Sequence, residues 1–224
     1  PNAYLSGWMA WFGHTIAGSL YAVAFGSFFA HLLKTSGVIG DDTGIPVDKI
    51  LAVIAIIIFT FVNVRGSSDT GKVGNAITFT QLAIIGILIV AAIGAMMFAN
   101  PNWSDNYTDF LPSGVAGLAL AMGLTFIAFE GYEIISQAGD EIRNPKKNIP
   151  REILISLGIV VSVYILFTFV FIGGLNESVI GMPAWEFIGS FGELGIIEAA
   201  DQFLPFGALI VLAGGLVSTL SALN

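Results

Sequence analysis

The stretch Phe129-Glu130-Gly131-Tyr132-Glu133 places two carboxylates and a glycine in the middle of an apolar run that extends from residue 112 to residue 143. A straight helix over this run would be roughly 46 Å long, whereas the hydrocarbon core of a bilayer is about 30 Å thick. A glutamate at the bilayer centre costs ~2.5 kcal/mol or more. Non-helical backbone there is stable only where protein or a water-filled cavity satisfies its polar groups. The stretch therefore predicts a broken membrane helix beside a cavity.

The rest of the chain is equally apolar. Hydrophobic residues make up 55% of it and charged residues 11%, a composition typical of a membrane helix bundle rather than of a soluble domain. We expect an all-α, polytopic membrane helix bundle that forms a single transmembrane domain. Its expected spans are residues 4–33, 50–64, 76–99, 113–143 (broken near 127–131), 149–175 and 204–224. Residues 183–203 mix apolar and acidic side chains, which predicts an extracellular re-entrant segment of amphipathic helices over the outer face.

Charge distribution predicts the orientation of these spans. Six of the eight Lys and Arg residues lie in the second and fourth loops, whereas the first, third and fifth loops are rich in Asp and Glu. Because cytoplasmic loops carry the excess of basic residues, we expect residues 65–75 and 140–151 to be cytoplasmic. The sequence thus predicts a multi-pass protein of the cell membrane, with the lipid bilayer as its surroundings.

Several kinds of site are not indicated. The chain has no cysteine and two separate histidines, so neither a disulfide framework nor a metal site is predicted. No nucleotide-binding or nucleic-acid-binding motif is present, and no cofactor is expected. The chain lacks an initiator methionine and stops inside its last apolar run, which suggests a fragment. Its oligomeric state is left open.

Polar side chains within the apolar runs are candidate site residues. His14 lies roughly 15 Å inside the cytoplasmic end of the first run, near the midplane. It is either a neutral imidazole bonded to a neighbouring helix or a residue that lines a pocket or handles a proton. Gln81 is expected to bond between helices. Ser218 and Thr219 either bond back to their own helix or supply oxygen ligands to a hard cation.

The loop after the broken run contains a further pattern. Pro145 is expected to end a helix near Asn144, because proline disfavours helix in the residue before it. Asn148 and Pro150 then suit the cap and first turn of the next helix.

These residues together resemble the amino acid, polyamine and organocation (APC) superfamily of secondary transporters. The resemblance rests on Phe129-Glu130-Gly131-Tyr132-Glu133, Ala138, Glu141, Asn144-Pro145 and Asn148-Ile149-Pro150, in the family's order. It implies helices 3 to 8 of a LeuT-like bundle of inverted repeats, with a broken helix 6. The family's helix 1 would precede this chain.

The resemblance also implies roles for individual residues. The substrate-binding half-site would comprise Ile127, Ala128, Phe129, Glu130 and Gly131, whose carbonyls receive a substrate ammonium. Phe129 resembles the family's aromatic gate.

His14 falls where the family's helix 3 lines the pocket for the substrate's side chain. Glu133 matches a family glutamate and either takes part in ion coupling or caps the second half-helix.

Coupling is where the chain departs from many proton-driven relatives. They carry a lysine in helix 5, and the matching position here is Gln81. Ser218 and Thr219 resemble the sodium ligands of related folds, so the coupling ion is expected to be Na+ or H+. No other metal is expected.

The resulting hypothesis is a secondary active amino acid transporter working by alternating access. One alternative is a channel or structural membrane subunit with Glu130 and Glu133 along a pore or an interface. A second is an intramembrane enzyme, which would need a nucleophile or metal cluster that the sequence does not contain.

Overall fold

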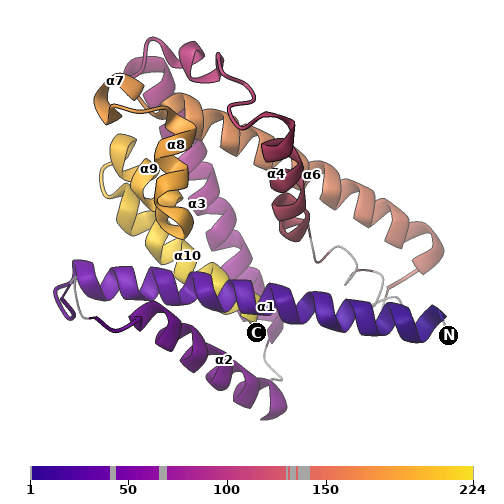
Figure 1. Ribbon diagram of the computed structural model, residues 1–224. Helices are drawn as coiled ribbons and strands as arrows, with labels where there is room; N and C mark the ends of the chain where they lie inside the picture. Colours follow the sequence, from indigo (N-terminus) through magenta and orange to yellow (C-terminus); the bar gives the residue numbers. More distant parts are fainter. Residues whose placement is uncertain are drawn as a thin grey trace.

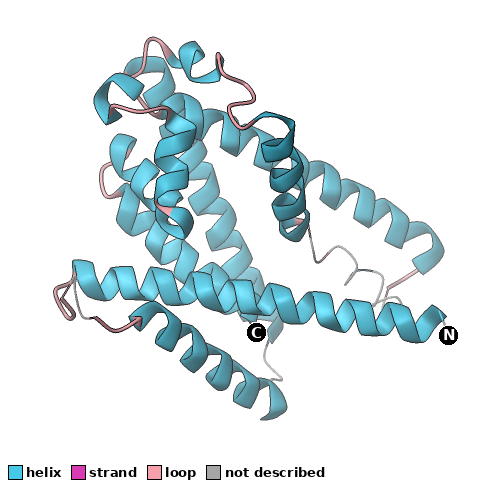
Figure 2. Ribbon diagram, viewed as in Figure 1, coloured by secondary structure: helices cyan, strands magenta, loops and turns pink. Residues whose placement is uncertain are grey.

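The computed structural model describes residues 2–40, 44–65, 70–129, 131, 135 and 142–223, and all the regular elements among them are helical (Figures 1 and 2). The longer helices are α1 (Asn2–Thr35), α2 (Val47–Arg65), α3 (Thr70–Phe98), α4 (Gly114–Ala128), α6 (Pro145–Gly174) and α10 (Gly207–Leu223). Shorter elements are η1 (Trp103–Tyr107), α7 (Glu177–Ile180), α8 (Ala184–Ser190), η2 (Gly192–Leu194) and α9 (Gly195–Phe203). The expected all-α fold class is confirmed.

Three helices in the described part of the chain are long and apolar enough to cross a membrane. They are Tyr4–Thr35, Asn75–Phe98 and Pro145–Gly174, and two shorter apolar helices cover Gly114–Phe126 and Gly207–Leu223. Many of their large apolar side chains are exposed, such as those of Val90, Phe126 and Ile165. An apolar exposed surface suits a lipid environment, and the protein is a membrane helix bundle.

Helices α3 and α10 connect the packed helices α1, α6 and α9, whereas α2 packs on α1 and α4 makes few contacts with the other helices. α1 crosses the bundle and contacts α2 on one side and α10 on the other, while α3 lies against both α6 and α10 (Figure 1). The buried core lies where α3, α6, α9 and α10 meet, and Phe171, Leu175 and Ile197 are its largest fully buried side chains. Residues of α3 and α6, which precede the α8–α9 segment in the chain, and of α10, which follows it, therefore pack in one core.

The start of α6 differs from the sequence prediction. α6 begins at Pro145, with Asn144 in the left-handed region (φ 53°) as the residue before it, and Pro150 lies inside the helix. The Asn148 amide donates to the carbonyl of Arg143 at 2.5 Å and so satisfies backbone just outside the helix. The prediction that Asn148 caps this helix is wrong by one turn, because Pro145 is itself well suited to the first helical position.

Candidate functional site

Helix α4 leads into the stretch near residues 127–131, part of which lies outside the described residues. Its last residue is Ala128, and the N–H of Phe129 donates to the carbonyl of Phe126 at 3.1 Å, three residues earlier. Gly131 has a φ of 109°, which residues with a side chain rarely adopt. Glu130 and Glu133 lie outside the described residues. Ile127 and Ala128 form the last turn of α4, directly before Phe129.

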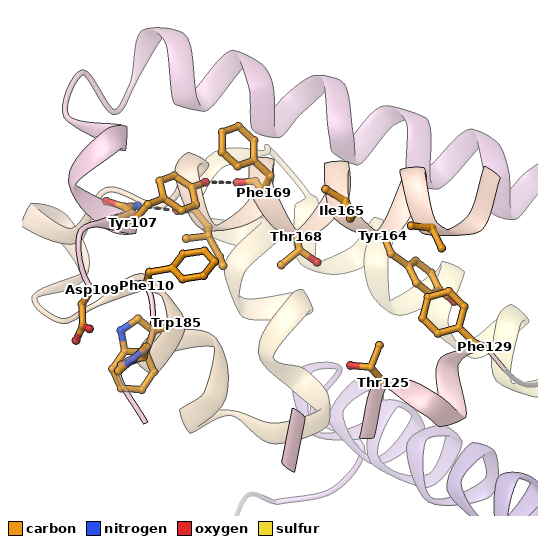
Figure 3. Close-up of a pocket in the computed structure, with 14 residues that line it drawn as sticks. Tyr107, Asp109, Phe110, Thr125, Phe129, Tyr164, Ile165, Thr168, Phe169 and Trp185 are labelled. Atoms are coloured by element: carbon orange, nitrogen blue, oxygen red, sulfur yellow. Dashed lines mark hydrogen bonds between the residues drawn. The ribbon is translucent and has the colours of Figure 1, made fainter. Parts of the chain in front are cut away.

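A cavity of about 490 Å³ begins beside Phe129 and lies between α4, α6 and the segment before α4 (Figure 3). Its residues are Asn106, Tyr107, Asp109, Phe110, Pro112, Thr125, Phe129, Val161, Tyr164, Ile165, Thr168, Phe169, Ile172 and Trp185. Figure 3 shows Phe129 and Tyr164 at one end and Asp109 and Trp185 at the other. The rings of Phe129 and Tyr164 meet edge to face, with their centroids 5.5 Å apart.

Some of the polar groups around this cavity are engaged with the backbone. The Asn106 amide donates to the carbonyls of Ile172 at 2.6 Å and Leu175 at 2.8 Å, and the Tyr107 hydroxyl donates to the carbonyl of Phe169. Burial raises the pKa of Tyr107 to about 12, although the nearby backbone of Gly173 acts in the opposite direction. Tyr107 is therefore protonated at physiological pH and can keep donating. The cavity walls suit the apolar part of a ligand rather than a charged group.

Three asparagines bind the segment before α4 to the end of α6. The buried Asn100 amide donates to the carbonyls of Gly173 at 2.9 Å and Leu175 at 2.8 Å, and Asn176 donates to the carbonyl of Ala99 at 3.0 Å. Together with Asn106 they form what we term the asparagine clamp (Asn100, Asn106 and Asn176). Sequence reasoning missed this clamp. Its only signal is the repeated asparagine in an apolar context, which does not identify the partner carbonyls.

His14 lies on α1 and is exposed. Its Nδ1 lies 2.6 Å from the carbonyl of Ala10. Because a carbonyl oxygen only accepts, Nδ1 carries the proton in this contact. His14 does not line the cavity beside Phe129.

Gln81 and Ser218 come together in a second cavity, of about 220 Å³. Gln81 comes from α3 and Ser218 from α10, and the other walls are mostly apolar, including Phe28 of α1 and Phe167 of α6. Both polar side chains are half-buried and make no hydrogen bond to another described residue. We term this space the Gln81–Ser218 cavity.

Thr219, next to Ser218, is buried and bonds to its own helix. Its hydroxyl reaches the carbonyls of Gly215 at 2.9 Å and Leu216 at 3.1 Å. A hydroxyl that donates in this way still has lone pairs on its oxygen. Thr219 can therefore bond to its helix and still offer oxygen to a cation. Among the described residues, no group of three His, Asp or Glu side chains could hold a metal ion.

The whole chain, residues 1–224, matches the amino acid permease family. The methylthioribose transporter of Bacillus subtilis (strain 168) is 30% identical over 210 residues, which cover 88% of this chain and 44% of that protein. Cationic amino acid transporter 4 of Homo sapiens is 28% identical over 175 residues, 73% of this chain and 27% of that protein. The branched-chain amino acid permease of Bacillus subtilis is 27% identical over 176 residues, 73% of this chain and 36% of that protein. The chain spans less than half the length of each.

Proposed function

Because the chain belongs to the amino acid permease family, we propose that it is part of a secondary active transporter that carries an amino acid across the cell membrane by alternating access. In this proposal residues 65–75 and 140–151 face the cytoplasm, as the basic residues of those loops favour. The family and its relatives are permeases and transporters, not enzymes. The alternative is a channel or structural subunit, and transport assays distinguish it from a secondary active transporter.

The observation that carries the proposal is the end of α4 at Ala128, beside a cavity. The end of a helix inside the membrane leaves backbone carbonyls without an intrahelical partner. In the proposed site the carbonyls of Ile127, Ala128, Phe129 and Glu130, together with Gly131, receive the substrate ammonium. The apolar side chain of the substrate lies in or next to the cavity beside Phe129. His14 is proposed to line the substrate pocket only in the full-length protein.

The substrate class needs a direct comparison, because one relative is named for methylthioribose, which has neither an ammonium nor a carboxylate. We expect purified full-length protein in proteoliposomes to exchange internal for external amino acid. A panel of apolar and cationic amino acids, with methylthioribose alongside, measures the preference. Uptake of methylthioribose alone would replace the amino acid in this proposal. A current that persists without saturation would instead indicate a channel.

We expect Phe129→Ala in the full-length protein to weaken substrate binding about tenfold, because the ring forms the wall beside the end of α4. The measurement is the substrate concentration that half-stabilises the protein in a thermal-shift titration. Phe126→Ala is the matched control, since Phe126 lies on the same helix, is 74% exposed and does not line the cavity. Equal affinity in both variants would show that Phe129 only packs against Tyr164.

For ion coupling we propose the Gln81–Ser218 cavity. Gln81 cannot carry the positive charge of the lysine found in many proton-coupled relatives. The Gln81 and Ser218 oxygens, with that of Thr219, are hard ligands suited to Na+. If Na+ does not bind, the site stays empty in an exchanger, or a proton moves on Glu130 or His14. Glu133 is proposed to assist coupling from the start of the second half-helix.

We expect a sodium gradient or internal amino acid to drive uptake, and a pH gradient to drive it only through a proton on Glu130 or His14. Where sodium drives uptake, Ser218→Ala should raise the Na+ concentration for half-maximal uptake by about tenfold. Ser221→Ala is the control, because Ser221 is exposed and outside this cavity. Uptake driven by pH, indifferent to sodium and unchanged in Glu130→Gln and His14→Ala, would contradict this assignment.

A further inference from the structure

A third cavity, of about 260 Å³, lies at the opposite end of α1 from His14. It is bounded by the last turns of α1, the start of α2 and the η2 turn. Four titratable side chains line it: His31 and Lys34 from α1, Asp48 from α2 and Glu193 from η2. The remaining walls are mostly apolar and comprise Ala30, Ile45, Val47, Phe191 and Leu194, with Ser27. We term it the outer cavity.

The four titratable side chains of the outer cavity have no bonding partner within the described part of the chain. None of the side chains of His31, Lys34, Asp48 and Glu193 makes an ion pair or hydrogen bond to another described residue. His31 and Asp48 are half-buried. Lys34 and Glu193 are exposed, so the group whose lack of a partner is costly is the half-buried carboxylate of Asp48, unless something else satisfies it. A bound ligand would do so.

The positions of the basic and acidic side chains indicate the charges that a ligand must carry. The basic groups come from one wall, α1, and the carboxylates come from α2 and η2. A simple anion would meet two carboxylates, and a simple cation would meet Lys34. A metal ion is disfavoured as well, because no three candidate ligands in the described residues are close enough to hold one. A molecule with a carboxylate and an ammonium satisfies both walls.

We propose that the outer cavity binds a zwitterionic α-amino acid with an apolar side chain, at a site separate from the one beside Phe129. The carboxylate of the ligand lies toward Lys34 and His31, and its ammonium lies toward Asp48 and Glu193. The apolar wall takes the side chain. The volume lies below the roughly 300–1,000 Å³ of pockets for drug-sized ligands, which suits a free amino acid.

The test is equilibrium binding of radiolabelled L-leucine to the purified full-length protein. We expect two sites per chain, and Lys34→Gln or Asp48→Asn should weaken one of them about tenfold or more while the other is unchanged. Lys49→Gln is the control, because Lys49 is an exposed neighbour of Asp48 that does not line the cavity. Glu193 is left unchanged because it also lines the Gln81–Ser218 cavity.

Leucine analogues test the charge pattern. Leucinol keeps the ammonium and 4-methylvalerate keeps the carboxylate, so neither should compete at the site that Lys34→Gln weakens. Competition by either analogue as strong as that by leucine would overturn the proposal. So would leucine binding in which no site responds to Lys34→Gln or Asp48→Asn. Unaltered unfolding midpoints show that the variants fold.

Failure of this proposal is distinguishable from failure of the transport proposal. Loss of the site that responds to Phe129→Ala concerns transport, whereas loss of the site that responds to Lys34→Gln concerns the outer cavity alone.

Discussion

Asn100→Ala should lower the free energy of unfolding by about 2 kcal/mol or more, because it leaves the carbonyl of Gly173 without its side-chain donor and removes one of the two donors to the carbonyl of Leu175. Asn100 is 3% exposed and its amide donates to the carbonyls of both Gly173 and Leu175. These carbonyls lie at the end of α6, where the helix no longer satisfies its own backbone. Removal of the amide therefore loosens the segment before α4 from α6.

The matched control is Asn102→Ala, two residues along the same segment. Asn102 is exposed, and its side chain makes no capping hydrogen bond at the start of η1. We expect a change within about 0.5 kcal/mol for this variant. Thermal unfolding of the detergent-solubilised full-length protein, followed by tryptophan fluorescence, compares the two. Similar midpoints for both variants would show that the clamp contributes little.

The fold class could be predicted because its signal is local. Long apolar runs with few charges specify membrane helices residue by residue, whatever their neighbours are. The start of α6 was harder, since Asn148 and Pro145 both suit a helix start and only the structure distinguishes them. The sequence therefore predicts the kind of element better than its first residue.

The candidate site depends on contacts between distant residues, and the sequence carries little of that information. Phe129 was singled out because it adjoins two glutamates in an apolar run, but nothing local identifies Tyr164 or Trp185 as walls of the same cavity. Gln81 and Ser218 are polar residues within apolar runs, to which the resemblance to a family assigns a role in coupling, and they line one cavity. Their roles and those of Glu130 and Glu133 stay predictions. The outer cavity could not be predicted from the sequence, because its charged residues lie in or near expected loops, where charged residues are common.

Gly26→Ala should separate α1 from α2, because no side chain fits at this crossing. A methyl group at Gly26 would lie 2.1 Å from the carbonyl oxygen of Asp48 and 3.0 Å from the backbone nitrogen of Ala52. Both are backbone atoms of α2 that a rotamer change cannot move. Overpacking of this kind costs about 1–3 kcal/mol. That cost exceeds the gain of about 1 kcal/mol from replacing glycine with alanine within a helix.

Gly18→Ala is the matched control, because it makes the same substitution in α1 at a position without a close neighbour in α2. Nothing lies within 4 Å of a methyl group at Gly18, so this variant should be as stable as the parent or slightly more stable. The two substitutions thus have opposite expected signs, and unfolding midpoints in detergent measure both. Because Asp48 also lines the outer cavity, Gly26→Ala should weaken leucine binding there while Gly18→Ala leaves it unchanged. Equal midpoints for the two variants would mean that α1 and α2 do not pack this closely.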